Sequence, residues 1–318
     1  MVAQTLLDTM RMGLVVCRRM NDSLAGPLVS IILTTLNGAR YLRESIDSCL
    51  AQSHQEIELI IVDGGSTDGT LDIVASYGGD ARVRLIHQPN NTGRLPGAIN
   101  LGLDAARGSF LTWTQDDCRY EPQALSRMVA VLEADPSLGQ VYADYWEIDA
   151  DGRAVICHES CEPEEILSAP DDPLGVCFLI RRSVREAVGS HDPQSYPCQD
   201  FDYRIRIAKQ FQSSHLREPL YSWRFHGDSL TGRLGWPVLA RKDVEIRLCH
   251  GLIRGVDARS HLAAIDAADA FERYQNRDWS AVFPAAFNAV RRKPAYLANR
   301  GLWSIAIRSL WRSAAANH

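Results

Sequence analysis

Short apolar runs rich in β-branched residues alternate with helical patterns in the first third of the chain, and this alternation constrains the fold more than any other feature. The predicted strands cover residues 28–35, 58–62, 83–87 and 109–114. Between them, apolar side chains recur at helical spacing in residues 39–52, 70–77 and 96–106. Strands joined through helices need right-handed crossovers. The sequence therefore predicts a parallel sheet covered by helices.

The alternation weakens after residue 135. Two strand patterns, residues 140–148 and 153–158, flank the turn Asp149-Ala150-Asp151-Gly152 and predict an antiparallel hairpin. Further strands are predicted over residues 174–180 and 221–225, and helices over 181–188, 200–211 and the stretch after 236. We therefore expect an α/β fold with a mixed, mainly parallel sheet flanked by helices. Its expected parts are an N-terminal extension that need not be ordered (1–27), an α/β domain (28–232) and a small helical appendage (233–318).

Composition narrows the classes of partner and compartment. The 318 residues are 46% hydrophobic and carry a formal net charge of −5, which gives no reason to expect a nucleic-acid partner. Eight cysteines form no Cys-x-x-Cys pair and no zinc-type spacing, which favours a reducing cytoplasm. No run reaches the roughly 20 apolar residues of a membrane span. Charges interrupt residues 6–20, so no signal peptide is expected, and a start at Met20 is equally plausible.

An acidic residue ends the second predicted strand. Asp63 follows the apolar run 59–62 and precedes the glycine-rich stretch 64–70. The chain has no Gly-x-x-x-x-Gly-Lys-Ser/Thr and no Gly-x-Gly-x-x-Gly, so we expect the carboxylate itself to accept hydrogen bonds from a base or a ribose. The alternative is that Asp63 caps the next helix, but Ser66 and Asp68 lie closer to its start.

Polar residues also follow the neighbouring strands. Asn37 comes after the first strand and the pair Asp116-Asp117 after the fourth. The carboxyl ends of parallel strands meet at one edge, where ligands bind in open α/β sheets. Two carboxylates there suit a metal ion that holds phosphates. An Asp-Asp dipeptide is more often a solvated turn, but the strand pattern directly before this one favours the metal site.

Five segments together resemble the family 2 glycosyltransferases, which have the Rossmann-like GT-A fold. In chain order they are residues 29–37, 62–70, 115–117 (Gln-Asp-Asp), 199–202 (Gln-Asp-Phe-Asp) and 224–226 (Arg-Phe-His). The resemblance covers residues 28–232. It implies an inverting enzyme that moves a sugar from a nucleoside-diphosphate sugar to a hydroxyl of a polysaccharide or glycolipid, as in the synthesis of cell-envelope polysaccharides.

The resemblance also implies roles for the donor site. Thr35, Asn37 and Asp63 match positions that hold the nucleoside. Asp116 and Asp117 match the metal-binding acids, which would hold Mn²⁺ or Mg²⁺ against the diphosphate, so Asp116 contacts both the metal and the donor. Thr114 stands where the family often has a further Asp, which puts strict metal dependence in doubt.

The remaining implied roles lie elsewhere in the motifs. Asp200 matches the general base, with a first-turn helical acid as the alternative. Gln199 replaces the usual Glu and leaves the Asp200 pKa less raised. His226 matches a residue that reaches the metal or the diphosphate, and a structural histidine is equally compatible with its position. Arg94 stands in for a basic residue that the family carries at Ile99, unless it is only an exposed loop arginine.

The role of one residue and two alternative functions stay open on the sequence alone. Arg224 could pair with a phosphate or with a surface acid. A catalytically inactive protein that binds sugar nucleotides or carbohydrates would share the fold and tolerate Thr114 and Gln199. A nucleotidyltransferase is the weakest alternative, because residues 34–43 lack the glycine- and arginine-rich loop with a lysine that this class carries.

The C-terminal tail combines basic and apolar residues. Residues 279–318 contain no acid and six basic residues, Arg291, Arg292, Lys293, Arg300, Arg308 and Arg312. One hypothesis is a helix that packs on the catalytic domain and exposes its arginines. The other is a peripheral contact of residues 291–313 with an anionic membrane, at the inner face of the plasma membrane, where a lipid-linked acceptor would lie.

Overall fold

A computed structural model describes residues 26–92, 94–169 and 175–316. The chain divides into two compact units. The first comprises Met1–Pro163, Leu174–Ser190 and Gln210–Arg224, and the second Glu164–Pro173, His191–Lys209 and Phe225–His318. Apart from residues 26 and 27, the expected N-terminal extension lies outside the described residues. The boundaries at 28 and 232 stay predictions.

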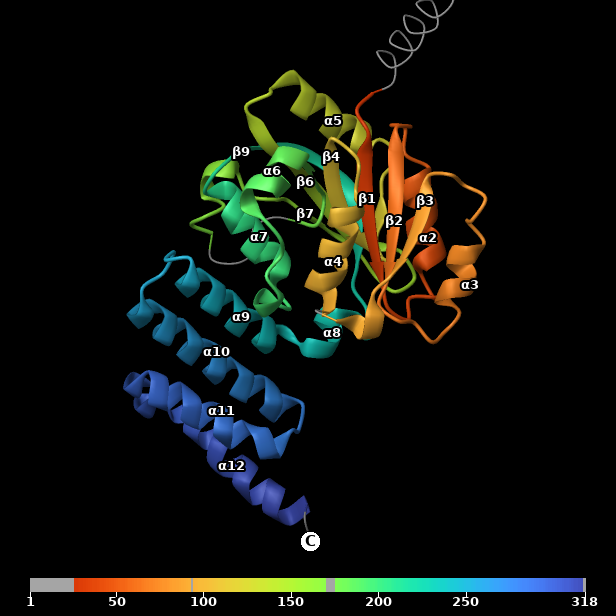
Figure 1. Ribbon diagram of the computed structural model, residues 1–318. Helices are drawn as coiled ribbons and strands as arrows, with labels where there is room; N and C mark the ends of the chain where they lie inside the picture. Colours follow the sequence, from red (N-terminus) through yellow and green to blue (C-terminus); the bar gives the residue numbers. More distant parts are fainter. Residues whose placement is uncertain (1–25, 93, 170–174, 317–318) are drawn as a thin grey trace, which may run out of the picture. The chain divides into compact units, whose positions relative to one another are not determined.

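The first unit is built on one mixed sheet, which has nine strands within the described residues (Figure 1). They are β1 (Val29–Thr35), β2 (Ile57–Asp63), β3 (Val83–His87), β4 (Phe110–Gln115), β5 (Arg119–Tyr120), β6 (Leu138–Ile148), β7 (Ala154–His158), β8 (Phe178–Arg181) and β9 (Gln212–Arg224). The order across the sheet is β3, β2, β1, β4, β8, β6, β9, β5, with β7 paired to β6. The predicted mixed α/β fold is confirmed.

Strands β1 to β4 form the parallel half that the alternation predicts. β1 pairs in parallel with both β2 and β4, and β2 with β3. The helices of this unit are α2 (Leu42–Leu50), α3 (Thr70–Ala75), α4 (Arg94–Ala105), α5 (Ala124–Ala134) and α6 (Arg182–Val188). Strand residues alternate between the two faces: Ile31 and Leu33 join a core with α2 and α5, whereas Ile32 meets α4. A Cβ on Gly102 of α4 would lie 2.3 Å from Ile32 Cγ2, so a glycine is needed for this close packing.

The other half of the sheet is mostly antiparallel. β6 and β7 form the predicted hairpin, and β8 pairs antiparallel with β4 and β6. β9 begins at Gln212 and pairs in parallel with β6, so this strand is much longer than the predicted 221–225. The register of the pair shifts where Pro219 opposes Asp144, which fits the missing N–H of proline.

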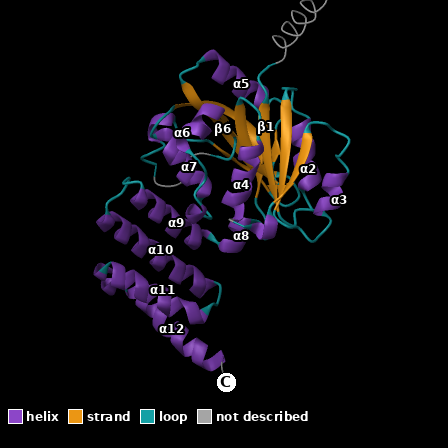
Figure 2. Cartoon of the chain, in the orientation of Figure 1, coloured by secondary structure: helices purple, strands orange, loops and turns teal. Residues whose placement is uncertain are grey.

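The second unit is helical (Figure 2). Its helices are α7 (Gln199–Ala208), α8 (Leu230–Leu234), α9 (Trp236–Cys249), α10 (Gly255–Gln275), α11 (Trp279–Arg292) and α12 (Arg300–Ala316), together with short 3-10 turns. Alanines supply much of the core of α10, α11 and α12, which lets these helices approach closely. Within the described part of the chain, none of the helices is both long and apolar enough to cross a membrane.

Candidate active site

The ends of β1, β2 and β4 bring three of the predicted residues together. Thr35 is the register partner of Asp63, and the Gly64 N–H donates to the Thr35 carbonyl at 2.9 Å. The Thr35 hydroxyl donates to Asp116 Oδ2 at 2.5 Å. Thr35 therefore connects the two acidic positions, as expected for residues at the carboxyl edge of neighbouring parallel strands.

Asp63 shapes the loop that follows its own strand. The residue is 1% exposed, and its carboxylate accepts from the N–H groups of Gly65 at 3.0 Å and Ser66 at 3.2 Å. His87, at the end of β3, brings Nδ1 to 3.7 Å from Asp63 Oδ2. The start of α3 is served by Asp68, which accepts from the Thr70 N–H at 3.0 Å. Asp63 is therefore not the helix cap. His87 was not singled out from the sequence, although it ends the third strand of the predicted parallel sheet.

Asn37 joins the loop after β1 to the loop after β2. Its backbone is left-handed, with φ 56°. Its side-chain oxygen accepts from the Thr67 N–H at 2.8 Å, and its own N–H donates to Ser66 Oγ at 2.8 Å. The Gly38 N–H adds a bond to Thr70 Oγ1 at 3.0 Å. These contacts fix both loops at the edge that carries Asp63.

Asp116 and Asp117 form an electrostatically unusual pair. Burial and the neighbouring Asp117 charge raise the pKa of Asp116 to about 7, although the Thr35 hydroxyl opposes the shift. A Cβ at position 38 would lie 2.0 Å from Asp116 Oδ2, so only Gly38 allows this approach. Two oxygen donors whose mutual repulsion a cation would relieve fit Mn²⁺ or Mg²⁺.

The described residues alone do not complete a metal site. Within the described ranges, no group of three or more His, Cys, Asp or Glu side chains is arranged to hold a metal. The further ligands would have to come from a bound diphosphate and water. Thr114 is buried, and its hydroxyl shares a 2.6 Å hydrogen bond with the Tyr221 hydroxyl. A carboxylate in its place would disturb that buried pair.

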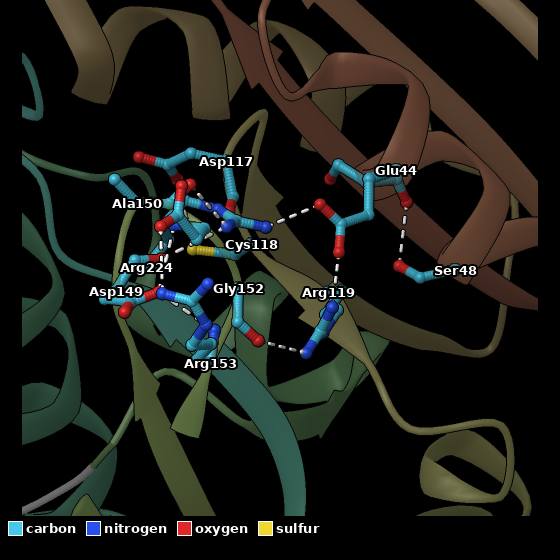
Figure 3. Close-up of polar contacts among 12 residues, drawn as sticks. Glu44, Ser48, Asp117, Cys118, Arg119, Asp149, Ala150, Gly152, Arg153 and Arg224 are labelled. Atoms are coloured by element: carbon cyan, nitrogen blue, oxygen red, sulfur yellow. Dashed lines mark hydrogen bonds and ion pairs between the residues drawn. The ribbon is translucent and has the colours of Figure 1, made fainter. Parts of the chain in front are cut away.

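Arg224 holds the Asp117 turn, a role that the sequence left open (Figure 3). Its side chain is buried, and its Nε donates to the Asp117 carbonyl at 2.9 Å. Nη1 donates to the carbonyls of Asp149 and Ala150, each at 3.2 Å, and Nη2 pairs with Glu44 Oε2 at 2.5 Å. Because all three guanidinium nitrogens bond to these partners, Arg224 acts by positioning the turn at Asp117 against the β6–β7 turn.

Like His87, Glu44 was not singled out from the sequence. It also contacts Arg119, which donates to the Gly152 carbonyl at 3.1 Å (Figure 3). Its only sequence signal is an acid in the first turn of α2, which the helix dipole alone would explain.

Arg94 is the first residue of α4 and follows the loop after β3. It is exposed and has a left-handed backbone, with φ 54°. Its carbonyl accepts from Gln88 Nε2 at 3.0 Å, and the same amide holds the Thr92 carbonyl at 2.6 Å. Gln88, buried behind the loop, therefore sets the backbone from which Arg94 extends.

Asp200 and His226 belong to the second unit. Asp200 is half-buried in the first turn of α7 and accepts from Gln199 Nε2 at 2.9 Å. Its neighbour Asp202 is instead paired with Arg206 at 3.0 Å and His250 at 2.7 Å. The two acids of this turn thus have different partners. The carbonyl of half-buried His226 accepts from the Ser229 N–H at 3.1 Å.

Comparison with known proteins identifies the family of this architecture. The family model described as "Glycosyl transferase family 2" matches residues 30–189. An uncharacterized glycosyltransferase of Rickettsia typhi is 36% identical over 221 residues, which cover 67% of this chain and 68% of the relative. Chondroitin synthase of Pasteurella multocida is 27% identical over 64% of this chain and 21% of its own length. The chain spans about a third of the length of several curated relatives, for example 35% of a Rickettsia felis glycosyltransferase.

Solved structures agree on the fold. TarS 1-349 of S. aureus in complex with UDP-GlcNAc has a TM-score of 0.60 at 15% identity, over 83% of this chain and 81% of that one. The mannosyltransferase PcManGT from Pyrobaculum calidifontis, in complex with GDP-Man and Mn²⁺, has a TM-score of 0.55 at 18% identity, over 90% and 88%. At these identities the likeness shows the fold alone, and it confirms the predicted GT-A architecture.

Proposed function

The chain belongs to glycosyl transferase family 2, and from this premise we propose that it is an inverting glycosyltransferase. It moves a sugar from a nucleoside-diphosphate sugar to a hydroxyl of a polysaccharide or glycolipid acceptor. The observation that carries the proposal is the polar edge formed by Thr35, Asp63 and Asp116. Two relatives named as polysaccharide synthases, the chondroitin and hyaluronan synthases of Pasteurella multocida, support the acceptor class.

In this proposal the nucleoside lies against the loops after β1 and β2. Asp63 and Asn37 accept hydrogen bonds from the base or ribose through lone pairs that remain beside their loop contacts, since each oxygen can accept more than one bond. The bonds between the two loops hold these groups in place before the donor arrives, which lowers the ordering cost of binding. Arg94 pairs with the diphosphate.

Asp116 and Asp117 would hold Mn²⁺ or Mg²⁺, with His226 as a further contact to the metal or the diphosphate. When bound, the cation neutralises the charge that develops on the departing nucleoside diphosphate. Thr35 holds the Asp116 carboxylate by its 2.5 Å hydrogen bond, and Arg224 holds the Asp117 backbone. Both contacts limit the motion of the two acids.

Asp200 serves as the general base. The acceptor oxygen forms a bond to the anomeric carbon while the bond to the diphosphate breaks, and the hydroxyl proton passes to the Asp200 carboxylate. This single in-line displacement inverts the configuration and needs no enzyme nucleophile. The Gln199 amide donates to the Asp200 carboxylate at 2.9 Å and can help to orient it.

A thermal-shift screen of nucleoside diphosphates and their sugars, with and without Mn²⁺, tests the donor site. We expect one nucleotide class to raise the melting temperature, more so with Mn²⁺, and Asp63→Asn to remove the effect. The exposed Asp151, substituted as Asp151→Asn, is the matched control. If no nucleotide shifts the wild type, the donor proposal is wrong.

A transfer assay with Asp200→Asn tests the base. We expect transfer to fall at least about hundredfold, while calorimetry gives the same donor affinity as the wild type. Glu186→Gln, an exposed acid of α6, should keep full transfer. An inactive sugar-nucleotide or carbohydrate binding protein is the alternative, and its wild type would bind the donor without transfer or hydrolysis.

We also propose that the protein works in the cytoplasm. The cysteines at 49, 118, 157, 177 and 249 are free thiols in the described part of the chain, as a reducing compartment favours. Burial raises the pKa of Cys49 to about 12, so this thiol stays protonated and unreactive. The finding of disulfides in protein taken from its native cell, with thiols blocked at lysis, would contradict this location.

A further inference from the structure

The outer face of α12 carries large apolar side chains that the helical core does not cover. The inner face packs into that core through Leu302, Ile305 and Ala306. On the outer face, Ile307 is 52% exposed, Leu310 50% and Trp311 76%. Residues three and four apart share one side of a helix, so these three side chains form a single apolar stripe. We call it the α12 stripe.

Basic residues are frequent in the segment that carries the stripe, although the whole chain is acidic. Arg292 pairs with Asp266, and Arg312 stacks over the rings of Tyr274 and Trp279. The other four basic residues of this segment are exposed and form no ion pair with any residue that the structure describes; they are Arg291, Lys293, Arg300 and Arg308. Residues 279–318 contain no acid that could neutralise them.

Helix stability does not explain the position of Arg300. It occupies the first turn of α12, where the helix dipole disfavours a cation. Counting by helical spacing, Arg300 lies in line with Ile307 and Trp311, at steps of seven and four residues, and Arg308 flanks that line. The exposed face of α12 therefore presents cations and apolar groups together.

We propose that this face docks the protein onto an anionic lipid surface. Ile307, Leu310 and Trp311 enter the headgroup region, with the tryptophan at the boundary that its amphipathic ring favours. Arg300 and Arg308 contact the lipid phosphates. The helix lies in the plane of the surface, in keeping with the lack of a membrane-crossing helix in the described chain.

Charge decides between a lipid surface and a second copy of the chain. A symmetric contact between two copies would bring the same patch together from both sides. Each copy would add the same unpaired cations and no acid from this segment. An anionic surface instead pairs with Arg300 and Arg308. The proposal rests on α12 alone and does not depend on the proposed catalytic function.

The test is co-sedimentation of the full chain with vesicles of phosphatidylcholine, with and without phosphatidylglycerol. We expect binding only to the anionic vesicles, weakened by added salt. Ile307→Ser combined with Trp311→Ser should weaken binding at least about tenfold. Arg300→Gln combined with Arg308→Gln should weaken it by about as much, since each cation near such a surface contributes about fivefold.

Val155→Ser combined with Ile156→Ser is the matched control, because it removes two exposed apolar side chains of β7 in the other unit. This variant should bind like the wild type, and all variants should keep the wild-type melting temperature. The proposal is overturned if the wild type ignores anionic vesicles at low salt or if the α12 variants bind unchanged. It is also overturned if the α12 substitutions abolish a dimer in sedimentation experiments, because a second copy then covers the stripe.

Discussion

Two acids at the sheet edge of the first unit and two buried acids of the helical unit have different kinds of partner. At the sheet edge of the first unit, Asp116 accepts from the neutral Thr35 hydroxyl, and Asp63 accepts mainly from backbone N–H groups. In the helical unit, Asp266 pairs with Arg241 at 3.0 Å and Arg292 at 2.8 Å. Asp269 similarly pairs with Arg241 and Arg273.

In the proposed site, this difference would separate acids that receive a ligand from acids that hold the fold. An arginine partner cancels the charge of a carboxylate, and removal of either member leaves the other buried and unpaired. A neutral donor leaves the negative charge in place, so a cation or a hydrogen-bond donor from a substrate still gains by binding there. Asp200, which accepts from the Gln199 amide, resembles the sheet-edge acids in this contact.

The sharpest way to break the comparison is to neutralise Asp116. We expect Asp116→Asn to lower transfer at least about hundredfold, because the variant loses a negative charge that would hold the metal ion against the diphosphate. Its melting temperature should stay equal or rise, since the variant buries no charge. Transfer assays, scanning calorimetry and Asp151→Asn as the exposed control test this. A stable, fully active variant would remove Asp116 from the site.

The corresponding change in the helical unit should cost stability instead. Asp266→Asn leaves Arg292 without its carboxylate and Arg241 with Asp269 alone, and we expect a loss of about 2–4 kcal/mol in the free energy of unfolding. Asp257→Asn, which removes an exposed partner of Arg254 on the same helix, should change it by less than about 1 kcal/mol. Urea unfolding measures both. Equal losses in the two variants would show that the buried pairs have no special weight.

Arg224 sharpens the comparison within the first unit, because this arginine acts on a backbone turn. Lysine keeps the charge but lacks the planar fork that reaches Asp117, Asp149 and Ala150. We expect Arg224→Lys to lower kcat about tenfold with a smaller change in the donor KM. Arg127→Lys, in an exposed pair with Glu218, should keep wild-type kinetics. Steady-state kinetics with varied donor decide, and an unchanged kcat would contradict the positioning role.

The smallest expected effect concerns pH. The folded pKa of Asp116, about 7, lies above its ordinary 3.8. The folded protein therefore binds this proton more tightly, so the stabilisation is complete below pH 3.8 and is lost as pH rises through 7. A divalent cation competes with the same proton, so stabilisation by Mn²⁺ should grow with pH. Melting temperatures measured across pH 7 with and without Mn²⁺ test this. In Asp116→Asn, the stabilisation by Mn²⁺ should no longer grow with pH.

Part of the fold was accessible to sequence reasoning because its signals are local. The strands ending at Thr35, Asp63 and Gln115 are mainly apolar runs, and their parallel arrangement follows from the helices between them. Most of β9 could not be predicted from the sequence. Residues 212–220 are mainly polar and include Pro219, and they become a strand only because β6 pairs with them across a shifted register.

The candidate site divides in the same way. The sequence picked out the acids at the strand ends, because their position after an apolar run is visible in one dimension. It could not assign Arg224, whose partner Glu44 lies 180 positions earlier, and it offered no means of finding the Thr35–Asp116 contact.

The sequence by itself determined the alternation of strands and helices, the edge at which polar residues collect, and the family. Only the tertiary structure decided which partner each charged group takes. Asp116 meets a hydroxyl, Asp266 meets two arginines, and Arg224 meets an acid and three carbonyls. The physical reason is that apolar periodicity is set by neighbouring residues, whereas the environment of a buried charge is set by groups that folding brings from far along the chain.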